Sequence, residues 1–151
     1  DPIIAGAGGD VCAVDGPDLG ARVKAATGGA DIKLGIDAVA GDATQHLADC
    51  LADNAVIANY GLLSGEPCQL SPNDIIFRNI SLKGVWLSMW LKGRGSTPES
   101  RAAVYDELRA HIIEGRMHAE IEATYPLAQI KDAVTHAMRQ RAGKVVILPN
   151  G

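Results

Sequence analysis

Residues 34–61, LGIDAVAGDATQHLADCLADNAVIANYG, contain the pattern that decides the fold. Two short apolar runs, Leu34–Val39 and Ala55–Tyr60, flank a stretch from Ala43 to Asp53 whose apolar residues recur at helical spacing. Short apolar strands that alternate with helices are typical of a parallel sheet covered on both faces. The sequence therefore predicts an α/β fold with a doubly wound parallel sheet.

The pattern continues on both sides of this stretch. Val11–Val14 is predicted as a strand and Asp18–Thr27 as a helix that ends at two glycines. After a long polar connection, Ile80–Leu87 is predicted as another strand. The run Ser96–Glu99 supplies the cap, proline and acid of a helix start, and this helix should end at Gly115. Its inward face should carry three apolar side chains, those of Val104, Leu108 and Ile112.

The C-terminal part has a different pattern. His118–Tyr125 alternates between apolar and polar side chains, which predicts a half-buried strand. A helix should begin at Pro126 and end at Gly143, and Lys144–Leu148 is predicted as a last strand. One face of the first strand is polar, and we interpret it as solvent-exposed rather than as a metal site; it carries His118, Glu120 and Glu122.

The composition limits the function classes. With 47% hydrophobic and 21% charged residues, the 151-residue chain is typical of soluble globular proteins. Its net charge of -4 argues against a nucleic-acid partner, and no apolar run is long enough to span a membrane. The three cysteines fit neither a disulfide framework nor a zinc motif, so we expect reduced thiols and a cytoplasmic protein; they are Cys12, Cys50 and Cys68. No metal site is predicted, because the remaining histidines lack ligand partners at suitable spacing; these are His46, His111 and His136.

Ligands of an open parallel sheet bind beyond the carboxyl ends of its strands. Three strand ends meet this description: Asp37–Gly41, Asn59–Leu63 and Val85–Leu87. A flat cofactor across these ends would meet exposed backbone groups. Taken singly, each glycine is also explained as a turn, and Trp86 and Trp90 as core or interface residues. No nucleophile elbow and no phosphate-binding loop occurs, so no catalytic residue is predicted.

Two longer stretches resemble a known family. Residues 34–90, LGIDAVAGDATQHLADCLADNAVIANYGLLSGEPCQLSPNDIIFRNISLKGVWLSMW, resemble the second half of the nucleotide-binding domain of zinc-independent medium-chain dehydrogenases/reductases. The words D-x-V-x-G, YG and LKG-x-WL-x-x-W are similar to those of quinone oxidoreductases and 2-enoyl thioester reductases. Residues 115–149, GRMHAEIEATYPLAQIKDAVTHAMRQRAGKVVILP, resemble the closing segment of that family. The resemblance covers nearly the whole chain from Val11 onward.

The resemblance implies a partial Rossmann-type sheet in residues 1–115. Residues 116–151 would form a strand-helix-strand that normally joins a GroES-like catalytic domain. It implies NADPH or NADH as cofactor, with contacts from the segment after the second strand, Tyr60, Gly61, Leu62 and Leu63. The segment Val85, Trp86 and Leu87 would offer backbone groups to the nicotinamide carboxamide, and Lys144 would reach the cofactor. The family usually has Phe where Val85 stands, which favours backbone over side-chain roles here.

The family's catalytic domain and first glycine-rich turn are not in this sequence, which begins Asp1-Pro2 without a Met. We therefore expect a C-terminal piece of an NAD(P)H-dependent reductase of enoyl thioesters or quinones, inactive on its own. A homodimer would form through the Ile80–Leu87 strand, as the resemblance implies. Two alternatives stay open: a non-catalytic dimerisation or cofactor-binding module, and a zinc-dependent alcohol dehydrogenase.

Overall fold

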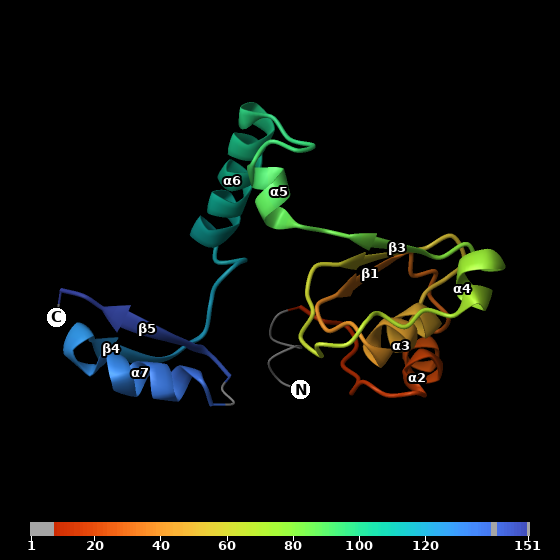
Figure 1. Ribbon diagram of the computed structural model, residues 1–151, viewed down its shortest axis with the longest axis horizontal. Helices are drawn as coiled ribbons and strands as arrows, with labels where there is room; N and C mark the ends of the chain where they lie inside the picture. The colour runs from red at the N-terminus through yellow and green to blue at the C-terminus, as the bar shows by residue number, and fades with distance from the viewer. Residues whose placement is uncertain (1–7, 140–141, 151) are drawn as a thin grey trace. The chain divides into compact units, whose positions relative to one another are not determined.

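Three parallel strands form the sheet of the first part of the chain (Figure 1): β1 (Leu34–Asp37), β2 (Val56–Asn59) and β3 (Ser81–Gly84). The computed structural model describes residues 8–139 and 142–150 and divides into two units, residues 1–92 and 93–151. The sheet order is β1-β2-β3, with the last residues of the three strands in register. This confirms the predicted parallel α/β arrangement.

Two helices pack below this sheet in Figure 1, α2 (Leu19–Ala26) and α3 (Asp42–Cys50). α3 contacts β1, and α2 packs against α3. A Cβ atom on Gly20 would lie 2.6 Å from the Asp49 carbonyl oxygen, so the helices approach this closely only with glycine at that position. The buried core lies between α3 and the sheet and comprises Ala48, Leu51, Ala55, Ile57 and Ile80.

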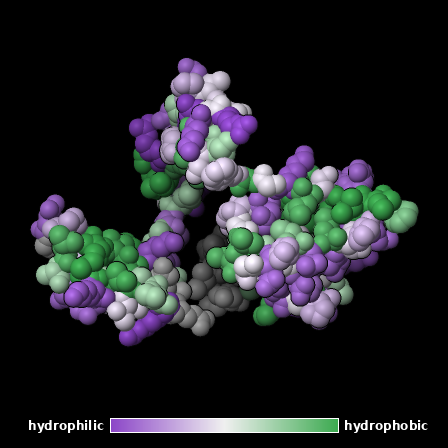
Figure 2. Space-filling view, viewed as in Figure 1, coloured by the Kyte–Doolittle hydropathy of each residue, from purple (hydrophilic) through white to green (hydrophobic). Residues whose placement is uncertain are grey.

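The opposite face of the sheet is open in the described part of the first unit. Leu34 and Ile36 point to that face and are 57% and 65% exposed. In the described residues, helices therefore cover one of the two sheet faces that the predicted doubly wound arrangement would cover. Apolar side chains also gather at the surface around α4 (Pro72–Ile76) in Figure 2, where Phe77 is 78% exposed.

Two predicted strands of this unit differ from the structure. The prediction for Val11–Val14 is wrong, because this segment pairs with no strand among the described residues and Val14 is 82% exposed. An apolar run becomes a strand only where a neighbour completes its hydrogen bonds. The predicted strand Ile80–Leu87 is too long, since β3 ends at Gly84 and α5 (Leu87–Leu91) begins three residues later.

The helices of the first unit follow the sequence more closely. α2 confirms the predicted helix, whereas α3 ends at Cys50 rather than Asp53. α4 was not expected in the polar connection before β3. Local signals explain it: the Ser71 hydroxyl accepts a hydrogen bond from the Asn73 N–H, and Pro72 occupies the first helical position.

The second unit begins with α6 (Pro98–Ile113), which confirms the predicted helix start. The Thr97 hydroxyl accepts from the Ser100 N–H at 3.2 Å, and the Ser100 hydroxyl accepts from the Thr97 N–H at 2.9 Å. The expectation of an inward apolar face is wrong, because α6 has no buried residue in the structure. The exposed face includes Val104 and Ile112.

A strand-helix-strand completes this unit. β4 (Ile121–Pro126) and β5 (Lys144–Leu148) pair in parallel, and between them the chain forms η1 (Leu127–Gln129) and α7 (Ile130–Ala137). α7 packs against both strands and buries Ala133. The predicted order of strand, helix and strand is confirmed, although β4 begins at Ile121 rather than His118 and α7 begins at Ile130 rather than Pro126. No helix in the described parts of either unit is long and apolar enough to cross a bilayer.

Candidate functional site

The segments that follow β2 and β3 lie at one edge of the sheet. Asp37, Asn59 and Gly84 are in register, so the chain leaves all three strands at the same level. The Tyr60 N–H donates to the Asp37 carbonyl at 2.9 Å, and the Val85 N–H donates to the Asn59 carbonyl at 2.7 Å. The structure thus places seven of the predicted site residues, Tyr60–Leu63 and Val85–Leu87, directly after the ends of two neighbouring strands.

These segments present free backbone donors beside apolar side chains. Among the hydrogen bonds of the described residues, none uses the N–H groups of Gly61, Leu62, Trp86 or Leu87. The side chains of Leu62, Trp86 and Leu87 are exposed, as is that of Tyr60. Apolar walls with a few polar groups are typical of sites for flat organic ligands.

Gly61 allows the segment after β2 to approach the segment after β1. A Cβ atom at this position would lie 2.4 Å from the carbonyl oxygen of Ala38 and 3.0 Å from its carbonyl carbon. The contact is with backbone atoms, which cannot rotate away as a side chain can. Only glycine therefore fits at this point of the strand ends.

A buried carboxylate, that of Asp37, lies behind these segments and is only 4% exposed. Its Oδ1 accepts from the N–H groups of Val39 at 2.8 Å and Ala40 at 3.0 Å. Its Oδ2 accepts from the Thr44 hydroxyl at 2.7 Å and the Asn59 side-chain amide at 3.2 Å. Burial alone would raise the pKa of Asp37, but these four donors outweigh it and hold the pKa below its usual value.

The sequence pattern indicated Asp37 only as the start of a strand end, without this network. A signal was present, because Asp37 is the only charged residue of an otherwise apolar strand. A carboxylate buried in that position needs hydrogen-bond donors, and the small residues and Thr44 that follow supply them.

Lys144, the eighth predicted site residue, is the first residue of β5 and belongs to the second unit. Its backbone N–H donates to the Glu120 carbonyl at 2.6 Å, and its side chain is exposed. Its contact with a cofactor stays a prediction.

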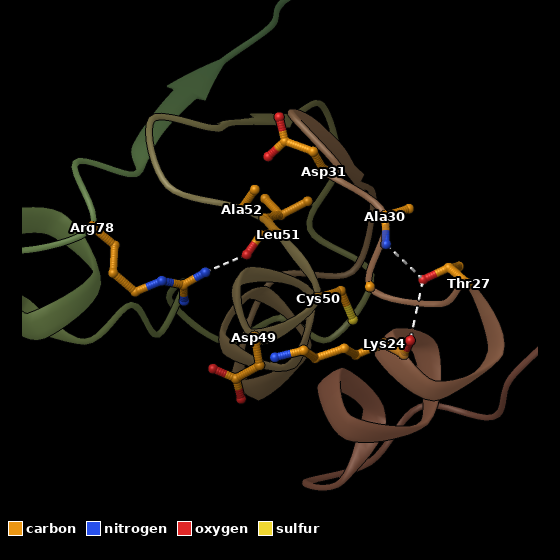
Figure 3. A pocket seen from close by; sticks show the side chains of 10 residues that line it. Lys24, Thr27, Ala30, Asp31, Asp49, Cys50, Leu51, Ala52 and Arg78 are labelled. Atoms are coloured by element: carbon orange, nitrogen blue, oxygen red, sulfur yellow. Dashed lines mark hydrogen bonds between the residues drawn. The ribbon is translucent and has the colours of Figure 1, made fainter.

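A cavity of about 360 Å³ lies at the other end of the first unit's sheet (Figure 3). Its lining includes Ala30 and Ala52, which precede β1 and β2. The Arg78 guanidinium in this cavity donates to the Leu51 carbonyl and forms an ion pair with Asp74 at 2.7 Å. These contacts attach the β3 side of the unit to α3, which is a structural role.

The second unit contains a hydrogen-bonded chain of three side chains. The Tyr125 hydroxyl lies 2.9 Å from His136 Nδ1, and His136 Nε2 lies 2.8 Å from Glu122 Oε1. The other Glu122 oxygen accepts from the N–H groups of Ala142 and Gly143. The His136 hydrogen bond, followed by these two N–H groups, lowers the pKa of Glu122. Glu122 is exposed, as the sequence predicts, but its hydrogen bond with His136 was not expected from the sequence pattern.

Comparison with known proteins gives the family. A family model described as zinc-binding dehydrogenase matches residues 6–104. The chain belongs to this family. One curated relative in it is the mitochondrial enoyl-[acyl-carrier-protein] reductase of Dictyostelium discoideum, 29% identical over 116 residues. The alignment covers 77% of this chain and 32% of the relative, so the chain spans about a third of that relative's length.

Solved structures of the family agree with the fold. A structure described as an NADPH:quinone reductase of Mesorhizobium loti matches with a TM-score of 0.71 and 25% identity, over 89% of this chain and 38% of the other. The mitochondrial 2-enoyl thioester reductase heterodimer of Candida tropicalis matches with a TM-score of 0.69 and 21% identity, over 87% and 37%. The predicted membership of the medium-chain dehydrogenase/reductase superfamily, near its enoyl and quinone reductases, is confirmed.

The family description names zinc, which proteins bind through three or four His, Cys or carboxylate ligands. Within residues 8–139 and 142–150, no three such side chains lie close enough to hold a metal ion. His46 lies 2.9 Å from Asp15 and His111 lies 3.8 Å from Glu107, and each forms only a pair. These residues do not fit a zinc centre.

Proposed function

We propose that this chain supplies the nicotinamide end of an NADPH site in a reductase that acts on the activated C=C bond of an enoyl thioester. One observation carries the proposal: the aligned strand ends present the unpaired N–H groups of Gly61, Leu62, Trp86 and Leu87 beside exposed apolar side chains. The similarity to an enoyl-[acyl-carrier-protein] reductase and to an NADPH:quinone reductase supports the reaction class and the choice of NADPH.

The backbone donors and the apolar side chains at the strand ends have different roles in this proposal. When bound, the nicotinamide supplies a hydride. The N–H groups of Trp86 and Leu87 donate to the nicotinamide carboxamide. These hydrogen bonds hold the nicotinamide in a fixed position relative to the substrate. Tyr60, Leu62 and Leu63 cover the cofactor and exclude water. Quinones are the second substrate class, favoured by the similarity to the Mesorhizobium structure.

The donor role of Leu87 can be tested with two variants at the same position. Leu87 is the first residue of α5, and the backbone of Trp86 before it is extended, so Leu87→Pro removes the N–H with little cost to the helix. Leu87→Ala removes the side chain and keeps the N–H.

We expect titration with NADPH, followed by cofactor fluorescence, to show binding by the unmodified chain and by Leu87→Ala. Loss of one hydrogen bond should weaken binding by Leu87→Pro about 3- to 10-fold relative to Leu87→Ala. Equal affinities of the two variants would contradict the donor role. A lack of NADPH binding by the unmodified chain would contradict the proposed function itself.

We further propose a homodimer through β3, which is an outer strand of its sheet in the described residues. The N–H groups of Ser81 and Val85 donate inward, to Ala55 and Asn59. Because backbone groups alternate along a strand, the Leu82 N–H faces outward, where a second copy could pair. The heterodimer of the Candida relative supports pairing between chains of this fold.

Proline on an outer strand with its N–H side facing outward is tolerated, so Leu82→Pro should block pairing without unfolding β3. We expect sedimentation velocity to show a dimer for the unmodified chain and for Leu82→Ala, and a monomer for Leu82→Pro. A monomer in all three samples, or a dimer that survives Leu82→Pro, would contradict this pairing.

The cytoplasmic location predicted from the sequence also stays a proposal. The names of the Dictyostelium and Candida relatives specify mitochondria. Fractionation of cells that express the whole protein, with cytosolic and mitochondrial marker proteins as controls, decides between the two compartments.

A further inference from the structure

The loop after β1 serves as a platform for the segment after β2. The N–H groups of Tyr60, Leu63 and Ser64 donate to three successive carbonyls of that loop at 2.9, 3.2 and 2.9 Å. These carbonyls belong to Asp37, Ala38 and Val39. The Ser64 hydroxyl also donates to the Val39 carbonyl, at 2.7 Å. The position of residues 60–64 therefore depends on how the loop after β1 is held.

The Asp37 carboxylate holds this loop in a strained conformation. Ala40 has a φ of 65°, in the left-handed region that is unfavourable for a non-glycine residue. Its N–H donates to Asp37 Oδ1, together with that of Val39. This pair of charge-assisted hydrogen bonds offsets the strain and sets the direction of the Ala38 and Val39 carbonyls.

The same carboxylate reaches the second segment through Asn59. The Asn59 side-chain amide donates both to Asp37 Oδ2 at 3.2 Å and to the Gly61 carbonyl at 3.1 Å. The orientation of the Gly61 carbonyl sets that of the peptide it shares with Leu62, and hence the direction of the Leu62 N–H. The buried Asp37 carboxylate thus sets the backbone orientation of two segments, the loop after β1 and the segment after β2.

We propose that Asp37 is a positioning residue of the cofactor site, whose ionised carboxylate orients the loop after β1 and, through Asn59, the backbone donors after β2. The expected effect on NADPH binding rests on the proposed function. The orientation of the two segments by Asp37 does not depend on it. Only a carboxylate fits, because four donors converge on its two oxygens. The amide nitrogen of Asp37→Asn would face two of those donors instead of accepting from them.

The first experiment measures NADPH affinity on the folded fraction of each variant of the 151-residue chain. We expect Asp37→Asn to raise the Kd about tenfold or more and Asn59→Ala to raise it about 3- to 10-fold. Asp106→Asn removes the same charge from an exposed ion pair in α6 and should leave the Kd unchanged within about twofold. A purely structural Asp37 would lower stability and leave the Kd of the folded protein unchanged, which would overturn the proposal.

The second experiment needs no cofactor. In ¹H–¹⁵N spectra, Asp37→Asn and Asn59→Ala should shift the amide signals of Gly61 and Leu62, whereas Asp106→Asn should not. Unshifted signals in a folded variant would overturn the proposal, and Asn59→Ala keeps this test available where Asp37→Asn fails to fold. Shifted amide signals together with no NADPH binding by the unmodified chain would contradict the proposed function and leave the positioning role supported.

Discussion

Replacement of Gly61 by alanine tests the close approach of the two strand-end segments. The new methyl carbon would lie 2.4 Å from the Ala38 carbonyl oxygen, far inside ordinary van der Waals contact at 3.4 Å or more. That oxygen cannot retreat easily, because it accepts the Leu63 N–H at 3.2 Å. The substitution therefore forces the backbone of one segment to move.

Overpacking of this kind costs about 1–3 kcal/mol, while a Gly-to-Ala change gains about 0.4–1 kcal/mol by restricting the unfolded chain. We expect Gly61→Ala to lower the free energy of unfolding by about 1–2 kcal/mol on balance. In urea denaturation followed by circular dichroism, this corresponds to a midpoint lower by roughly 0.5–1 M.

Gly84 provides the matched control, since it ends the neighbouring strand and a Cβ atom there would meet no heavy atom within 4 Å. Gly84→Ala should leave the free energy of unfolding unchanged within about 0.5 kcal/mol or raise it slightly. Equal midpoints for Gly61→Ala and Gly84→Ala would refute the argument that the Ala38 contact requires glycine.

Three further predictions concern buried and paired groups. Because folding lowers the pKa of Asp37, its contribution to stability is present above about pH 4 and is lost as the pH falls through the folded-state value. Urea titrations between pH 3 and 5 should therefore show that the free energy of unfolding depends less on pH for Asp37→Asn than for the unmodified chain. Parallel pH curves for the two proteins would exclude this contribution. Ile57→Val, at a fully buried position, should cost about 0.5–1.5 kcal/mol, and Ile76→Val, at an exposed one, less than about 0.5 kcal/mol; similar losses in thermal denaturation would contradict the core assignment. His136→Ala should raise the pKa of Glu122 towards its usual value in an NMR titration of the side-chain carboxyl, and an unchanged pKa would show that the pair is not formed in solution.

Local patterns predicted those elements whose neighbours lie close in the sequence. β1 and β2 were recognised because each apolar run is flanked by the helices and turns of a βαβ unit. Val11–Val14 has the same composition but no partner strand in the described residues, and a single sequence carries no signal for that difference. The segment Val85–Leu87 is more apolar than β3, whose sequence is Ser-Leu-Lys-Gly, yet the chain turns into α5 there.

The features of the candidate site also differ in how far the local sequence predicts them. The strand-end backbone was predictable because parallel strands place their carboxyl ends at one edge. The contacts of Asp37 with Asn59 and of Glu122 with His136 were not, because these partners lie 22 and 14 residues further along the chain. Side-chain hydrogen bonds over such separations depend on a register that only the folded chain shows.

The four-donor arrangement at Asp37 also constrains how this sequence can diverge. An apolar residue at position 37 would leave the buried Thr44 hydroxyl without its acceptor, a loss of about 1–3 kcal/mol, and would leave the Asn59 amide with the Gly61 carbonyl as its one remaining acceptor. A viable path must therefore alter two or three of these positions together. Among related sequences, positions 37, 44 and 59 should covary as a set, and a library randomised at all three should return correlated solutions rather than independent ones.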